Sequence, residues 1–116
     1  MIVDLPYPDK ALWPNGRAHW AQKARQAAKH RAWAYLAALE VKPEAYRHSG
    51  ETMPVTIRIF PKRYGPVPDK DNIIAASKAF LDGIADALGV NDQYFAAPVV
   101  EIDKERDGRF AVEVGT

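Results

Sequence analysis

Hydrophobic and polar residues alternate in four short stretches of the chain, and this pattern predicts β-strands. The first is "MIVDL" at residues 1–5, and the second is "MPVTIRIFP" at residues 53–61, where Val55, Ile57 and Ile59 occupy every second position. The others lie near "APVVEID" and "RFAVEV", which the polar turn "KERDG" separates. Each strand is long enough to bury one side of a sheet.

Residues 18–41 are rich in alanine and contain neither Gly nor Pro, which predicts a long helix. At roughly 100° per residue, one broad face is apolar, and we expect it to face the core. Its members are Trp20, Ala24, Ala28, Tyr35 and Leu39. The opposite face is expected to form a basic ridge of Lys23, Arg25, Lys29 and His30.

A second helix is predicted to begin near Asp69 to Asp71 and to end at Gly89, a residue type that commonly terminates helices. The order of elements is therefore strand, helix, strand, helix, strand, strand. This order predicts one α+β domain over residues 1–116, with a mixed sheet of about four strands and two main helices packed on one face.

The composition narrows the function classes. The chain has 116 residues, 47% of them hydrophobic and 27% charged, which is ordinary for a globular domain. It has no cysteine, which excludes disulfides and thiolate metal sites, and it has no Gly-x-x-x-x-Gly-Lys phosphate loop. No apolar run approaches the roughly 20 residues of a membrane span, and the first ten residues lead us to expect no signal peptide. We expect a cytoplasmic protein.

The charge is unevenly distributed, although the net charge is only +1. No acidic residue lies between Asp9 and Glu40, whereas this interval holds six lysines and arginines. From Asp82 onward, eight acidic residues face three basic ones. Such asymmetry favours one side that faces a polyanion and a separate acidic feature. An ordinary solvated helix face explains the basic stretch equally well.

The acidic residues at the two ends of the second helix are candidates for a metal site. Lys78 and Asp82 follow Asp71 by seven and eleven residues, which places all three on one helical stripe. Asp69 precedes the first turn, and Asp92 follows Gly89 by three residues. Carboxylates are the hard ligands that Mg²⁺ prefers, and a nearby lysine can orient a phosphate. Such sites hydrolyse phosphodiesters.

Structural roles explain the same residues without a metal. Asp69 suits the N-cap of the helix, and Asp71 suits its dipole. Lys78 and Asp82 have the spacing of an ordinary i,i+4 ion pair. Asp92, within "GVNDQ", suits a turn. The spacing alone leaves both interpretations open.

Several short motifs together resemble the RusA family of Holliday junction resolvases, in particular its phage-borne members. They are "D-x-D-N" at residues 69–72, Lys78 on the same helix, "NDQ" at residues 91–93, and the opening "LPYP" followed by "LWPNGRAHW". The similarity covers nearly the whole chain in order and is strongest in residues 68–95. Some members carry the lysine about one turn earlier, where this chain has Ala75, and an aspartate where it has Asn91.

The resemblance implies a small homodimer that binds four-way DNA junctions and nicks two opposing strands symmetrically with Mg²⁺ or Mn²⁺. It implies no small-molecule cofactor and no membrane partner. It makes Asp69, Asp71 and Asp92 the metal ligands and Lys78 the catalytic lysine, with Asn72 and Asp82 in support. Contacts to DNA phosphates are expected from basic side chains, namely Arg17, His19, Lys23, Arg25, Lys29, Lys62, Arg63 and Lys70.

Two other functions remain open at this point. A non-catalytic DNA-binding protein with the same fold would also bind DNA in a salt-dependent way, but it would not need the acidic residues close together. A scaffold protein with only solvated charges would have no affinity for DNA even at low salt.

Overall fold

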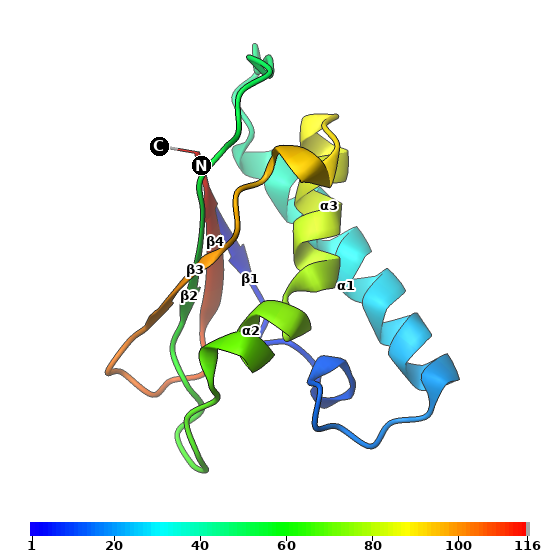
Figure 1. Cartoon of the computed structure of the whole chain (residues 1–116), viewed down its shortest axis with the longest axis vertical. Coiled ribbons are helices and arrows are strands. Elements are labelled where there is room, and N and C mark those ends of the chain that lie inside the picture. Colours follow the sequence, from blue (N-terminus) through cyan, green and yellow to red (C-terminus); the bar gives the residue numbers. More distant parts are fainter. Residues whose placement is uncertain (116) are drawn as a thin grey trace.

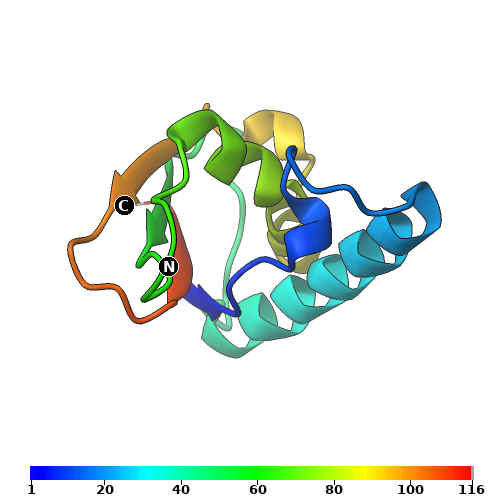
Figure 2. The same ribbon diagram turned by 90° about the horizontal axis from the view of Figure 1, so that it is seen from below.

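A computed structural model of the chain describes residues 1–115 and shows a four-stranded mixed sheet with its helices on one face (Figures 1 and 2). The strands are β1 (Ile2–Leu5), β2 (Val55–Ile59), β3 (Val99–Ile102) and β4 (Phe110–Val114), in the spatial order β1-β4-β2-β3. β4 pairs antiparallel with β1 and β2, whereas β2 and β3 are parallel. The predicted α+β class and the mixed sheet are confirmed.

Three α-helices and two short 3-10 helices complete the described chain. They are α1 (Trp20–Val41), α2 (Lys70–Ala76), α3 (Lys78–Leu88), η1 (Lys10–Leu12) and η2 (Asp92–Tyr94). Within residues 1–115, no helix has both the length and the apolar character that a membrane crossing requires.

The predicted single second helix is wrong, because the chain bends at Ser77 and forms α2 and α3 instead. The hydroxyl of Ser77 is buried and donates to the carbonyl oxygen of Ile73 at 2.6 Å, a carbonyl that also accepts the Ser77 N–H. Such back-bonding by a serine side chain bends helices. In Figure 1, α2 accordingly runs across the lower end of α3 rather than continuing it.

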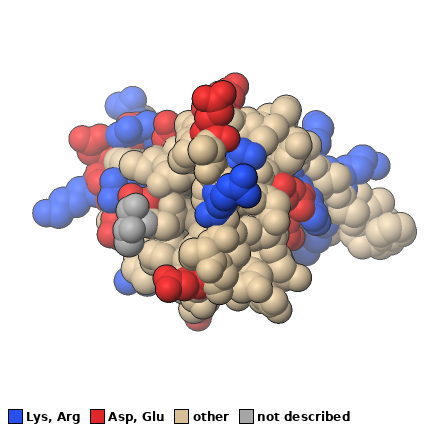
Figure 3. Space-filling model, turned by 90° about the horizontal axis from the view of Figure 1, so that it is seen from above, with Lys and Arg blue, Asp and Glu red and all other residues tan. Residues whose placement is uncertain are grey.

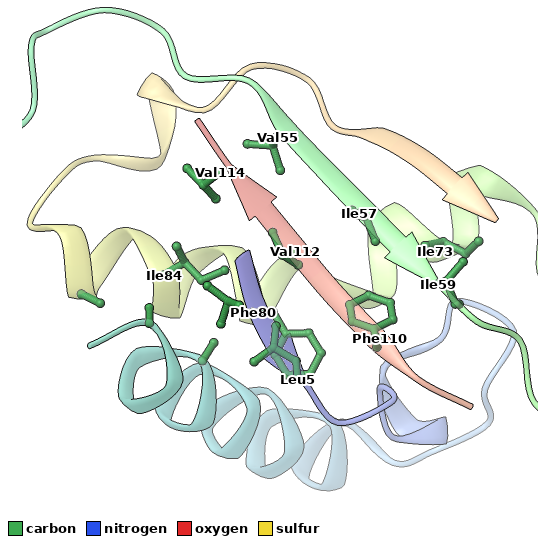
Figure 4. Packing of buried hydrophobic residues seen from close by; sticks show 14 of the residues in the cluster. Leu5, Val55, Ile57, Ile59, Ile73, Phe80, Ile84, Phe110, Val112 and Val114 are labelled. Carbon is green, nitrogen blue, oxygen red and sulfur yellow. The ribbon is translucent and has the colours of Figure 1, made fainter. Parts of the chain in front are cut away.

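The core lies between the sheet and the helices, as Figure 4 shows. Alternate strand residues enter it because successive side chains of a strand point to opposite faces. The main contributors are Leu5, Val55, Ile57, Ile59, Phe110, Val112 and Val114 from the sheet, and Ile73, Phe80 and Ile84 from the helices. The opposite face of the sheet carries exposed polar residues such as Asp4, Arg58 and Glu101.

The predicted core face of α1 is wrong. Its buried residues are His30, Ala34 and Ala38, which recur every four residues, whereas Trp20 is 75% exposed. The other residues predicted to face the core, Ala24, Ala28, Tyr35 and Leu39, are also exposed. Alanines occur around the whole helix, so its apolar periodicity does not identify one face. The small Ala34 side chain lies directly against Gly83 of α3.

His30 is a buried anchor between segments and does not belong to the predicted basic ridge. It is 1% exposed, and its Nε2 accepts a hydrogen bond from the backbone N–H of Asp9 at 3.0 Å. Its Nδ1 lies 2.7 Å from the carbonyl oxygen of Gln26, so Nδ1 carries the proton of the neutral ring. The ring centre lies 5.0 Å from that of Phe80 on α3.

Candidate active site

Lys78 is the centre of a cluster of polar side chains at the start of α3. Its Nζ donates to Asp82 Oδ1 at 2.9 Å and to Asp92 Oδ2 at 3.4 Å. The first contact is the predicted i,i+4 pair along α3. The second spans 14 residues and exists because Gly89, with φ of 67°, ends α3 in the left-handed region and turns the chain back. The chain reversal brings η2 beside α3.

A hollow of about 370 Å³ opens beside this cluster. Its polar lining comes from α1, α3 and the segment that enters η2, and comprises Arg31, Lys78, Asp82, Asp86, Asn91 and Asp92. We call it the site hollow. A neighbouring hollow of about 230 Å³ shares Lys78, Asp82 and Asp92 but is otherwise apolar. The three side chains therefore stand on a ridge between two depressions.

The electrostatics of the cluster favour the charged form of Lys78. Its hydrogen bond with Asp82 is the main reason that its pKa is raised, and the bond with Asp92 adds to the effect. On the opposite wall, the guanidinium of Arg31 lowers the pKa of the Asp86 carboxyl through their hydrogen bonds. Acidic and basic side chains also intermix on the face seen in Figure 3, so this face does not present a field of one sign.

Asp69 and Asp71 lie in a different place. Asp69 is the N-cap of α2, because its Oδ1 accepts the N–H of the half-buried Asn72 at 2.8 Å, and this confirms the structural role expected for it. Asp71 is exposed in the first turn of α2. Both residues therefore lie at the N-terminal end of α2, which is the end farther from α3 in Figure 1.

The three predicted metal ligands are consequently not assembled into one group. Within residues 1–115, no three side chains of His, Asp or Glu are arranged to hold a metal ion together. The bend at Ser77 is the physical reason, because it turns α2 away from the stripe on which Asp71 was expected to join Lys78 and Asp82.

The residues that do meet still fit a hard divalent cation. Mg²⁺ is usually bound by one or two carboxylates, and water and substrate phosphate complete its shell. Asp82 and Asp92 supply two carboxylates that already approach one cation, the Lys78 ammonium, beside an open hollow. Asp82, expected only in support, is thus better placed in this structure than Asp69.

The predicted DNA contacts are spread over three places. Lys23, Arg25 and Lys29 lie on the N-terminal half of α1, and Arg17 and His19 precede it, with His19 as its N-cap. Lys62 and Arg63 are exposed in the loop after β2, where each lies over a tyrosine ring. Lys70 begins α2 beside the Asp69 cap.

One ion pair of the site hollow was missed at the sequence level. Arg31 on α1 donates to both carboxylate oxygens of Asp86 on α3, at 2.7 and 2.9 Å. Neither residue stands out in its own segment, and 55 positions separate them. The available signal was Gly83, since a glycine inside a helix commonly marks a close approach between elements.

The chain is 34% identical over 118 aligned residues to a protein of Xylella fastidiosa described as "Uncharacterized protein". The alignment covers 97% of this chain and 74% of that protein. No family model and no solved structure matches the chain.

Proposed function

This chain belongs to the same family as the Xylella fastidiosa protein, and we propose that it is a metal-dependent, structure-specific endodeoxyribonuclease of the RusA type. Its proposed substrate is the four-way DNA junction, which it would resolve in the cytoplasm by paired symmetric nicks. The observation that carries this proposal is the grouping of Lys78, Asp82 and Asp92 beside the site hollow. The resemblance of the "D-x-D-N" segment supports it.

The proposed roles follow from the chemistry of these side chains. Asp92, together with Asp82, would hold Mg²⁺ or Mn²⁺. The resemblance proposes Asp69 and Asp71 as further ligands, although the structure does not group them with Asp92. The metal would supply an activated water and a counter-charge for the phosphate. Lys78 would donate from Nζ to a phosphate oxygen, which orients the phosphodiester and offsets negative charge as the bond to the leaving oxygen breaks.

Binding of a junction by a homodimer is supported by the two halves of α1. Basic residues on its N-terminal half would contact phosphates without reading sequence. Its C-terminal half carries exposed apolar residues, among them Tyr35, the 59% exposed Leu36 and Leu39, and these offer a surface that a second copy could cover. Two copies related by a two-fold axis would carry two sites, one for each nicked strand.

The test is incubation of the protein with a labelled four-way junction or a linear duplex, in Mg²⁺ or Mn²⁺. We expect paired symmetric nicks in the junction only. Asp92→Asn should lower the nicking rate by about 100-fold while junction binding persists, because it removes a proposed metal ligand and leaves the basic residues intact. Asp71→Asn tests the ligand that only the resemblance adds, and loss of nicking in this variant would give Asp71 a place in the site. Unchanged nicking by both variants would refute the metal site.

Two other outcomes point to the alternatives. Junction binding without nicking in any divalent metal would favour a non-catalytic DNA-binding protein. Absence of DNA binding even at low salt would favour a scaffold protein, because phosphate contacts strengthen as the salt concentration falls.

A further inference from the structure

We infer that the site hollow is a phosphodiester-binding site and that Arg31 is its fixed contact to the phosphate. This inference deepens the proposed function and rests on it. Arg31 ends the basic stretch of the sequence but is not among the side chains named as DNA contacts, and it reaches the hollow from α1, opposite Lys78 on α3.

The position of Arg31 is set by a close approach of two helices. A Cβ atom on Gly83 would overlap the carbonyl oxygen of Arg31 and would lie 2.9 Å from the Cβ of Ala34. The glycine therefore allows the backbone of α1 to rest directly on α3. Asp86 lies three residues beyond Gly83 on α3, and it receives the Arg31 side chain.

The ion pair fixes the guanidinium and leaves most of it free to bind. A guanidinium has five N–H donors, and Asp86 takes one from Nε and one from Nη2. Within residues 1–115, no acceptor is found for the donors on Nη1. The Arg31 side chain remains 52% exposed. A planar fork whose position is already fixed loses little conformational entropy when it binds phosphate.

The charge of the hollow indicates when phosphate would bind. Arg31 and Lys78 supply two positive charges, and Asp82, Asp86 and Asp92 supply three negative charges, so the lining sums to −1. A divalent cation bound between two of these carboxylates would change the sum to +1. A charge of +1 complements the single negative charge of one phosphodiester. Phosphate binding should therefore depend on the divalent cation.

The open face of the sheet offers a matched control. Arg58 pairs with Glu101 at 2.9 Å, and its side chain is 50% exposed, close to the value for Arg31. It lies on the face of the sheet that the helices do not cover. Arg58→Gln and Arg31→Gln therefore remove the same charge from the same kind of ion pair, but only Arg31→Gln removes it from the site hollow.

The first experiment measures junction affinity in Ca²⁺ as a function of salt for the wild type and both variants. Each phosphate contact contributes about 0.9 to the slope of log Kobs against log salt. We expect Arg31→Gln to lower the slope by about 1 and to weaken binding about tenfold, and Arg58→Gln to change neither. Equal slopes in all three proteins, or equal losses in the two variants, would overturn the inference.

A second experiment does not depend on nicking. Thymidylyl-thymidine, which contains one phosphodiester, is titrated in Mg²⁺ while the Nε–H signal of Arg31 is followed by NMR. A saturable shift of this signal that disappears without Mg²⁺ is expected, and no shift would overturn the inference.

If a thermal melt shows that Arg31→Gln does not fold, Arg31→Lys replaces it in the first experiment. Weaker binding is expected for Arg31→Lys, because lysine lacks the planar fork of donors of the guanidinium.

The two proposals fail in different ways. If the protein binds the dinucleotide at Arg31 but never nicks a junction, the proposed nuclease activity is refuted and the phosphate site is supported. If Arg31→Gln changes neither junction nicking nor the salt dependence of binding, the nuclease proposal stands and Arg31 is not a phosphate contact.

Discussion

The helices α2 and α3 arise from one continuous helical pattern, yet the fold holds them very differently. Seven of the eleven residues of α3 are buried, whereas only Ile73 and Ala76 are buried among the seven of α2. α3 thus presents Lys78 and Asp82 from a firmly packed surface. The acidic residues of α2 lie on a short helix whose start is held by the Asp69 cap.

This difference shows that nearness in sequence does not by itself bring candidate site residues together. Asp71 is closer to Lys78 in the chain than Asp92 is, but the cluster around Lys78 contains Asp92. A bend of one residue separates the first pair, and a reversal at Gly89 joins the second.

Substitution of Gly83 should have the largest effect on stability, because it disrupts the close packing that distinguishes α3 from α2. Gly83→Ala should destabilise the protein by about 2–3 kcal/mol, since the new Cβ forces α1 and α3 apart. Urea denaturation measures this change. Ala75→Gly on the exposed side of α2 is the comparison and should cost about 1 kcal/mol through helix propensity alone. A stabilised Gly83→Ala protein would contradict the close approach.

Substitution of Asp69 should have a smaller effect on stability. It can distinguish a role of Asp69 as the N-cap of α2 from a role as a metal ligand. Asp69→Ala should cost about 1 kcal/mol, whereas Asp69→Asn should cost almost nothing, because asparagine is an equally good N-cap. Thermal melts measure both changes, and junction nicking is assayed beside them. Loss of nicking in Asp69→Asn would give the carboxylate a chemical role, and retained nicking would leave Asp69 as a cap only.

Acidic pH should lower the stability of the protein through His30, and this is the smallest of the three predicted changes in stability. Burial lowers the pKa of His30 below its ordinary value of 6.5, although the hydrogen bond with Gln26 opposes this. Between the folded and unfolded pKa values, only the unfolded state binds the proton, so stability falls as pH drops below about 6.5. Denaturation across pH 4–8 should show this loss, and His30→Gln should reduce it. Identical pH profiles would exclude His30 as the cause.

The sequence predicted the sheet well because period-two alternation is a strong and local signal. All four strands, both ends of α1 and the C-terminal end of α3 lie close to their predicted positions. The bend at Ser77 was missed because no Gly or Pro marks it, and its cause is a side-chain hydrogen bond to the Ile73 carbonyl. The buried face of α1 was missed because alanine provides so little contrast between its sides.

The candidate site was predicted only in part, because local helix geometry can be read from the sequence whereas contacts between distant segments cannot. The Lys78–Asp82 pair follows from helix geometry alone and is present. The contact with Asp92 depends on a chain reversal whose direction the sequence did not settle. The Arg31–Asp86 pair depends on a distance between two helices, and only the packed structure gives that distance.

The N-terminal half of α1 extends away from the sheet, with η1 and the loop that follows it beside it (Figures 1 and 2). None of the ten residues before His30 in this helix is buried. A helical segment of that length is marginal in water on its own, so its amide hydrogens should exchange with solvent far faster than those after His30. This half also carries Lys23, Arg25 and Lys29. A polyanion that engages them would slow that exchange, and part of its binding energy would be spent on ordering the helix.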